Sequence, residues 1–391
     1  MIDNIYIFNY WWTANYGANL TAFALQQLIK DSILVDNSNY NQVIAEASKK
    51  FHKDFSKAYL NSCEHCNMQS SLINLSKTCN TFVVGSDQVF RPKLNKEVSK
   101  SFLLDFVQPN SKKIAFSASF GVDKEQFLKE NSKEVIEHMK KSLQSFDYVS
   151  AREKSGVEIC KDIFGINAEW VIDPVFLIDK KNYIKMISSS IKGYNGKIIA
   201  HLVANSNKKI KNYKGKQVIN LHNTNISIEE WLTAIQNCNL LIADSYHAIC
   251  FAIIFNKPFI VVTKQEQASA RFQSLFEKLG IEDQCLNSFD EIYTKDCIFN
   301  VDYEKVNQRI EEERQKGLAF LQKALESPIG KFEEKQAVRT QYLEETVCKL
   351  EQQANLKYQI KKELWNLWLI IFYKYLPKTM KNLIRRIRGS K

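Results

Sequence analysis

The 391-residue sequence lacks the marks of a secreted, disulfide-stapled or membrane-spanning protein. Its N-terminus has neither the basic start nor the apolar core of a signal peptide. Its nine cysteines are scattered and stand mostly in apolar runs, as Cys160, Cys238 and Cys250 do, which is typical of reduced thiols. The apolar run 364–376 is too short and too interrupted to span a bilayer, which takes about 20 helical residues. We therefore expect a cytoplasmic protein.

Two common signatures of ligand sites are also missing. No G-x-G-x-x-G dinucleotide fingerprint is present. Cys63 and Cys66 could begin a zinc site, but no second Cys/His pair lies at a suitable distance, so we expect no metal. The polar stretch 40–80 around these cysteines is interpreted as a variable surface insertion.

The body of the chain is nearly neutral, and the net positive charge is concentrated at its end. Residues 356–391 hold ten Lys/Arg against one acid, Glu363, a net charge of +9, which leaves +2 of the total +11 for everything before them. A nucleic-acid-binding domain would carry its basic surface on the folded body, so we expect no nucleic-acid partner. The overall content of 45% hydrophobic and 25% charged residues is that of a globular protein long enough for two domains and an appendage.

Short apolar runs that end in polar residues recur along the chain, which is the pattern of parallel strands in α/β proteins. A first half, 1–180, contains five such strand ends, and a second half, 181–300, repeats the pattern. We therefore predict two Rossmann-like, doubly wound α/β domains that face each other across a cleft. Residues 301–391 form a third segment, predicted to be helical and to end in a basic amphipathic tail.

The strongest candidate site follows the predicted strand 240–243. Asp244, Ser245, Tyr246 and His247 stand where this strand ends and a second apolar run of helical length begins. Ligands of open α/β sheets collect at such strand ends, and free helix N–H groups favour anions there. His247 is the one histidine of the six in such a place, so we predict that it carries the chemistry.

Seven segments, in this order, resemble the polysaccharide pyruvyl transferase family over roughly residues 5–285. The segments are 15–25 (NYGANLTAFAL), 84–89 (VGSDQV), 115–121 (AFSASFG), 151–156 (AREKSG), 172–177 (IDPVFL), 243–247 (ADSYH) and 271–275 (RFQSL). The resemblance implies a GT-B-like fold and the transfer of pyruvate from phosphoenolpyruvate to a sugar of a surface polysaccharide, with phosphoenolpyruvate as co-substrate and no cofactor. It places the chain in capsule, exopolysaccharide or other cell-envelope synthesis.

The resemblance also implies roles for individual residues. His247 matches the catalytic position, as acid or base, and Asp244 is expected to orient its ring or to hold the sugar. Arginines grip phosphate and carboxylate bidentately, which suits phosphoenolpyruvate. The further residues expected to bind substrate are Arg152, Arg271, Asn15, Gly17, Ser86, Asp87, Gln88 and Ser245.

Structural roles remain open for several of these residues. Arg152 could pair with Glu153, and His247 could cap a helix. Residues 86–88 could be a cap, and Asn15 and Gly17 could serve the turn. A GT-B glycosyltransferase using a nucleotide sugar and a non-catalytic scaffold protein of an envelope complex are alternative functions.

The predicted tail also has two interpretations. Apolar aromatics beside a cluster of basic residues fit a helix that lies in the interface of an anionic membrane. That reading predicts peripheral association with the cytoplasmic face of the inner membrane, where a lipid-linked glycan acceptor is presented. The alternative is a helix packed on the body or on a second copy, as in a homodimer.

Overall fold

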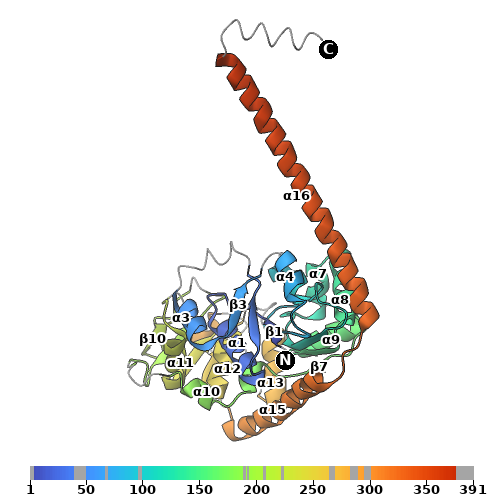
Figure 1. The fold of residues 1–391 in the computed structure, drawn as a ribbon. Helices are drawn as coiled ribbons and strands as arrows, with labels where there is room; N and C mark the ends of the chain where they lie inside the picture. Colours follow the sequence, from blue (N-terminus) through green and yellow to red (C-terminus); the bar gives the residue numbers. More distant parts are fainter. Residues whose placement is uncertain are drawn as a thin grey trace, which may run out of the picture. The chain divides into compact units, whose positions relative to one another are not determined.

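Two predominantly parallel β-sheets build the body of the chain (Figure 1). The computed structural model describes residues 4–38, 50–66, 69–95, 99–187, 191, 193–205, 208–221, 224–263, 269–281, 289–294 and 301–375. By its internal contacts the chain divides into two units, Met1–Arg339 and Thr340–Lys391. Both sheets belong to the first unit.

The first sheet has seven parallel strands in the spatial order β3-β2-β1-β4-β5-β6-β7. The strands are β1 (Ile5–Phe8), β2 (Ile33–Asp36), β3 (Ser62–His65), β4 (Thr81–Gly85), β5 (Lys112–Ala118), β6 (Tyr148–Ala151) and β7 (Glu169–Trp170). The chain winds outward from β1 to β3 and then returns to β4 on the other side of β1. Because parallel crossovers are right-handed, this reversal puts the connecting helices on opposite faces and opens a crevice at the carboxyl ends of β1 and β4.

The second sheet repeats this reversal with five strands in the order β12-β11-β8-β10-β9. The strands are β8 (Ile198–His201), β9 (Asn212–Tyr213), β10 (Lys216–Asn220), β11 (Leu240–Ala243) and β12 (Phe259–Val261). Only β9, which pairs with β10, is antiparallel. The reversal falls between β8 and β11, where His201 and Ala243 end their strands in register. The predicted pair of Rossmann-like, doubly wound, GT-B-like halves is confirmed.

Helices connect the strands and continue beyond the second sheet. They are α1 (Tyr16–Leu28), α3 (Lys50–Tyr59), α4 (Gln69–Leu75), α5 (Pro92–Asn95), α6 (Ser99–Phe102), α7 (Lys124–Glu130), α8 (Lys133–Gln144), α9 (Lys154–Asp162), the 3₁₀ helix η1 (Pro174–Phe176), α10 (Lys181–Ile184), α11 (Ile228–Asn237), α12 (Tyr246–Ile254), α13 (Ser269–Leu279), α14 (Glu291–Thr294), α15 (Tyr303–Glu326) and α16 (Phe332–Tyr375). Ser227 caps α11, since its side chain accepts a hydrogen bond from the Glu230 N–H. Gly280, which follows α13, has φ +63°.

Helix α1, which follows β1, and helix α12, which follows β11, meet in the core. Every residue of α12 is buried, and so are residues 17–25 of α1. The two helices pack on each other and on η1, so one hydrophobic core runs through both halves. A helix that is apolar all round needs partners on every side, which explains why α12 lies between elements of both halves.

The stretch 40–80 corrects the sequence analysis. It is not a surface insertion: its described part contains α3, β3 and α4, and β3 extends the first sheet at its edge. This strand was not predicted because Ser62–His65 is polar and lacks the apolar pattern used to predict strands. Edge strands are often polar. Strand β2 was also not predicted, because its apolar run is only three residues long.

Beyond the second sheet the chain is helical, as predicted. Helix α15 begins after Asp302, whose side chain caps it, and packs back on the first half, where Phe320 stacks on Phe116. Helix α16 runs without a break from Phe332 to Tyr375. No described helix is long and apolar enough to cross a membrane. The basic segment 383–388 lies outside the described residues, and the domain limits at 180 and 300 stay predictions.

Candidate active site

A cavity of about 740 Å³ opens where the chain reverses in both sheets. Its walls come from the loops that follow β1 and β4 in the first half and β8 and β11 in the second. Eight of the ten residues predicted for the site line it: Asn15, Gly17, Asp87, Gln88, Asp244, Ser245, His247 and Arg271. The other two, Ser86 and Arg152, are buried and do not belong to its lining. The predicted strand ends therefore come together across the two halves.

His247 occupies a seat built by the first half. It is the second residue of α12 and only 6% exposed. Its Nε2 lies 3.1 Å from the Thr21 hydroxyl oxygen on α1 and 3.5 Å from a carboxylate oxygen of Asp173. The other side of the ring lies against Gly17, where a Cβ atom would come within 2.1 Å of Nδ1. The imidazole makes no capping bond, so the alternative of a helix-capping histidine is not what the structure shows.

Asp173 is the carboxylate beside His247. It is fully buried just before η1, where its side chain also accepts the Val175 N–H. Burial alone would raise its pKa, but the hydrogen bond and charge of His247, together with Arg152, outweigh burial and hold the pKa of Asp173 below its ordinary value. Asp173 lies in the segment 172–177 that resembles the family, but it is not among the ten residues predicted for the site. Its place at a strand end, before a proline, was the available signal.

Arg152 is held behind the cavity by three carboxylates. Its guanidinium lies 2.7 Å from Asp173, 3.3 Å from Asp87 and 3.4 Å from Glu153, and its side chain is wholly buried. These charges outweigh the effect of burial, so the pKa of Arg152 is raised. Arg152 is absent from the lining of the cavity, and its predicted contact with substrate stays a prediction. Its pairing with Glu153, kept open from the sequence, is present as part of a larger network.

Arg271 differs from Arg152 in having no such carboxylates. It lies at the start of α13 and lines the cavity. Within the described part of the chain no carboxylate pairs with it, and its buried Nε has no hydrogen-bond partner. Burial, and next the positive charge of Arg152, lower its pKa. Its guanidinium lies 5.7 Å from the ring centre of Tyr246, and that of Arg152 lies 4.7 Å from the same ring.

Comparison with known proteins identifies the family of the chain. The family model described as polysaccharide pyruvyl transferase matches residues 15–265, well over half of the chain. The chain belongs to this family. No curated protein matches the chain. The family's matched range contains nine of the ten predicted site residues, and only Arg271 lies beyond it.

Several solved structures are similar to the chain at low identity. The UDP-N-acetylglucosamine 2-epimerase from Rickettsia bellii has a TM-score of 0.44 and 11% identity over 89% of this chain and 96% of that one. The UDP-GlcNAc 2-epimerase from Neisseria meningitidis, bound to UDP-GlcNAc, has 0.43 and 10% over 88% and 99%. A variant of the wall teichoic acid polymerase TagF has 0.38 and 10% over 89% and 90%.

Asp244, a residue inside the family match, does not orient the histidine. One of its carboxylate oxygens accepts the Val203 N–H at 2.5 Å, and the other accepts the backbone and side-chain N–H groups of Asn205 at 2.8 and 3.0 Å. It thereby shapes the loop after β8. The predicted orientation of the ring falls to Asp173 instead, while contact of Asp244 with a sugar stays a prediction because it lines the cavity.

The loop after β4 is arranged around Asp87. Its carboxylate accepts the Gln88 N–H at 2.8 Å as well as the Arg152 guanidinium. Gln88 in turn accepts a hydrogen bond from Arg91, and the Ser86 hydroxyl lies 3.4 Å from that of Ser117. The next described helix, α5, begins at Pro92, four residues after Gln88, and contact of residues 86–88 with substrate stays a prediction.

Two lining residues stand at helix starts. The Asn15 side chain accepts the Ala18 N–H and caps α1, so Asn15 serves the turn and lines the cavity as well. Ser245 holds the capping position of α12 but makes no such bond. The first turn of α12 thus lacks a side-chain acceptor from its cap residue at the cavity wall.

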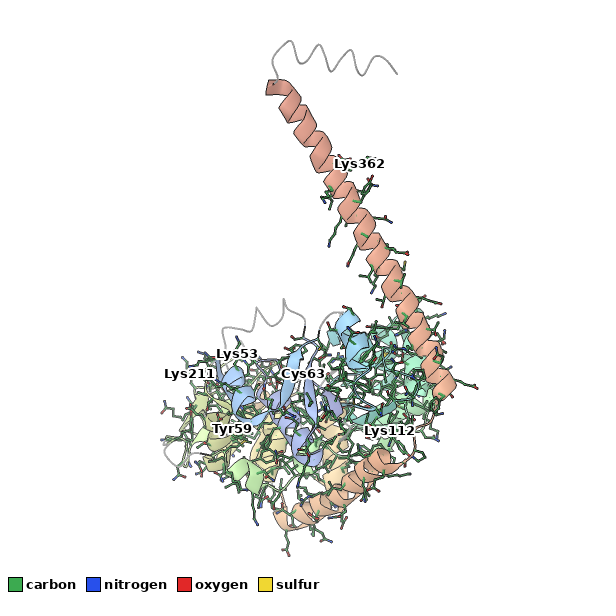
Figure 2. The ribbon with its side chains drawn as sticks, in the orientation of Figure 1. Lys53, Tyr59, Cys63, Lys112, Lys211 and Lys362 are labelled. Atoms are coloured by element: carbon green, nitrogen blue, oxygen red, sulfur yellow. The ribbon has the colours of Figure 1, made fainter. Side chains whose placement is uncertain are left out.

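The described residues hold no group of three or more His, Cys, Asp or Glu side chains suited to a metal ion. Cys63, on the edge strand β3, is labelled in Figure 2. A hydrogen bond with Cys66 is the largest influence on its thiol and lowers its pKa to about 7. Among the described residues the pair is therefore two hydrogen-bonded thiols.

Proposed function

We propose that the chain transfers pyruvate from phosphoenolpyruvate to two hydroxyl groups of a sugar in a cell-surface glycan. A proton adds to C3 of the enol, and a sugar oxygen adds to C2. The C2–O bond to phosphate breaks, inorganic phosphate leaves with the bonding pair, and the second sugar oxygen closes the ketal at C2. The two hydroxyl protons balance the proton gained by C3 and the one taken up by phosphate.

The guanidinium of Arg271 carries this proposal, because among the described residues no carboxylate pairs with it and its buried Nε has no hydrogen-bond partner. A cation in such surroundings is costly, and burial and Arg152 already lower its pKa. A dianionic phosphate or a carboxylate would supply the missing negative charge and match the guanidinium bidentately. Arg271 shares the cavity wall with His247, so an anion bound there lies beside an imidazole, a common proton donor or acceptor in catalysis.

Arg152 supports the same reaction indirectly. It fixes Asp173 and Asp87 and lies against the Tyr246 ring, whose other guanidinium neighbour is Arg271. Removal of Arg152 would leave buried carboxylates without their cation, which is strongly destabilising. We therefore assign Arg152 to the framework of the site and Arg271 to the donor.

The size of the cavity supports a second substrate. Pockets of roughly 300–1,000 Å³ enclose drug-sized ligands, so about 740 Å³ leaves room for a sugar beside the small donor. Asn15, Asp87, Gln88 and Asp244 offer hydrogen-bonding groups on the walls. We propose that these groups hold the acceptor sugar.

Phosphate release from phosphoenolpyruvate, measured with a panel of lipid-linked or nitrophenyl sugars, tests the reaction. We expect release that depends on one sugar class and that falls by about 10²-fold or more in His247→Asn. A thermal-shift comparison separates the alternative glycosyltransferase: stabilisation by a nucleotide diphosphate and not by phosphoenolpyruvate would contradict the proposal. An envelope phenotype untouched by His247→Ala would favour a non-catalytic scaffold.

The tail is proposed to keep the enzyme beside a lipid-linked acceptor. The described helix α16 reaches Tyr375 and so carries most of the apolar run 364–376 on one continuous helix. Residues 356–391 hold a net charge of +9, and each Lys or Arg near an anionic surface contributes about 1 kcal/mol to binding. Anionic vesicles should sediment the full chain but not a chain shortened to residue 355. Equal sedimentation of both would reject membrane binding by the tail.

A further inference from the structure

The two ring nitrogens of His247 have different surroundings. Nε2 lies 3.1 Å from the Thr21 hydroxyl oxygen and 3.5 Å from Asp173. Nδ1 makes no hydrogen bond within the described part of the chain and lies on the side of the ring that faces Gly17. Gly17 and His247 both line the cavity, and among the described residues only Nε2 of the ring has polar protein partners.

The hydrogen bonds of Thr21 show which nitrogen carries the proton. The Thr21 hydroxyl donates to the Gly17 carbonyl one turn earlier on α1, at 2.8 Å. Its single proton is used there, so toward His247 it offers only a lone pair. Asp173, whose charge is held by Arg152, is also an acceptor. Two acceptors at Nε2 require an N–H at that atom.

We propose that Thr21, with Asp173, holds His247 in the Nε2–H tautomer, which makes Nδ1 the nitrogen that exchanges a proton with the substrate. This role in catalysis rests on the proposed function, whereas the tautomer does not. When His247 acts as a base, the Nδ1 lone pair takes the proton of the sugar hydroxyl whose oxygen bonds to C2. The resulting imidazolium keeps its Nε2–H directed at Thr21 and Asp173, and Nδ1 then releases the proton to the departing phosphate.

Thr21 is a positioning residue in this scheme, because it touches the imidazole and not the substrate. Asp173 also binds Arg152 and caps η1, so its replacement would disturb more than the histidine. Thr21 provides the cleaner test: valine has its shape without the hydroxyl, and serine keeps the hydroxyl. Thr233 is a matched control, since it is also buried in a helix and donates one turn back, to Glu229 O.

Nitrogen NMR of the full chain labelled with ¹⁵N-histidine reads the tautomer directly. The His247 signals are identified by their loss in His247→Asn and followed above the titration of the ring. We expect Nε2–H in the native protein, a measurable fraction of Nδ1–H in Thr21→Val, and native spectra in Thr21→Ser and Thr233→Val. A native Nδ1–H tautomer, or a Thr21→Val spectrum identical to the native one, would overturn the proposal.

Kinetics with phosphoenolpyruvate and an accepted sugar test the consequence. In Thr21→Val we expect kcat to fall at least about tenfold with the KM for phosphoenolpyruvate unchanged, and Thr21→Ser to restore kcat. An equal loss in Thr233→Val, or a change in KM alone, would contradict a positioning role. If no sugar is pyruvylated, the proposed function fails, and the NMR result still decides the tautomer.

Discussion

Substitution of Arg271 is the most direct test of the proposed donor site. Arg271→Met keeps most of the apolar contact with Tyr246 but removes the charge. A hydrogen bond to a charged group is worth about 1.5–3 kcal/mol, so we expect the KM for phosphoenolpyruvate to rise about 10- to 100-fold. Calorimetric titration with phosphoenolpyruvate gives the same quantity without turnover. Unaltered affinity in Arg271→Met would place the donor elsewhere, and Arg271→Lys, which keeps charge but not the fork, should lie between the two.

Gly17 makes a second prediction at the scale of one atom. A methyl group at this position would lie 2.1 Å from Nδ1 and 2.3 Å from Cγ of His247, so the ring or the helix must move. Alanine is otherwise a better helix residue than glycine. Gly17→Ala should therefore lose most turnover while its fold is retained, as judged by circular dichroism and melting temperature. Full activity in this variant would show that His247 does not need its present seat.

At the scale of elements, the sequence predicted the strands and helices whose buried residues follow a periodic pattern. It did not predict those that lack such a pattern. The apolar strands β4 and β11 and the capped helix α11 follow their patterns closely. The polar edge strand β3 does not, because one side of it has no partner strand. For the site, the strand end before Asp244 and the family resemblance together predicted eight of the lining residues. Which carboxylate meets His247 depends instead on packing between the halves. That long-range contact has no sequence pattern, so Asp173 and Thr21 were missed.

The edge strand β3 also provides an element-scale prediction. With a pKa of about 7, Cys63 is substantially a thiolate at pH 7.5, whereas an ordinary cysteine is mostly protonated. We expect iodoacetamide to label Cys63 first, with a rate that rises through pH 7. Because the hydrogen bond with Cys66 is the main cause, Cys66→Ala should move this rise upward in pH and slow the labelling at pH 7. Peptide mass mapping of briefly treated protein, with Cys160 as the buried reference, measures both effects.

At the scale of the whole molecule, a buried charge cluster joins distant parts of the chain. Lys335, at the start of α16, lies 2.7 Å from Asp147, and Asp147 also accepts the N–H groups of Lys113 and Gly330. Lys112 reaches the carbonyl of Leu325 at the end of α15. The turn between the last two helices is thus tied to the amino ends of β5 and β6, on the side of the sheet opposite the cavity. The function of this cluster is therefore architectural.

Lys113 makes the cluster testable by pH. Its side chain is fully buried, with Ser145 at 2.7 Å, and burial is the main cause that lowers its pKa from 10.5 to about 8, with Asp105, Lys335 and Asp147 as smaller influences. The unfolded chain therefore binds a proton between pH 8 and 10.5 that the folded chain does not. Stability from this group must rise with pH across that window, and the folded state carries a penalty of about 3 kcal/mol below it.

Lys113→Met removes this titration while it keeps the volume of the side chain. The free energy of unfolding of the native protein, minus that of the variant, should increase by up to about 3 kcal/mol from pH 8 to pH 10.5. The native protein thus gains stability relative to the variant. Urea midpoints measured at matched pH values give this difference, and the other buried lysines largely cancel because both proteins contain them. A flat difference across the window would mean that Lys113 has the same pKa in the folded protein as in the unfolded chain. A difference that falls with pH would mean that Asp105 and Asp147 raise the pKa of Lys113 by more than burial lowers it.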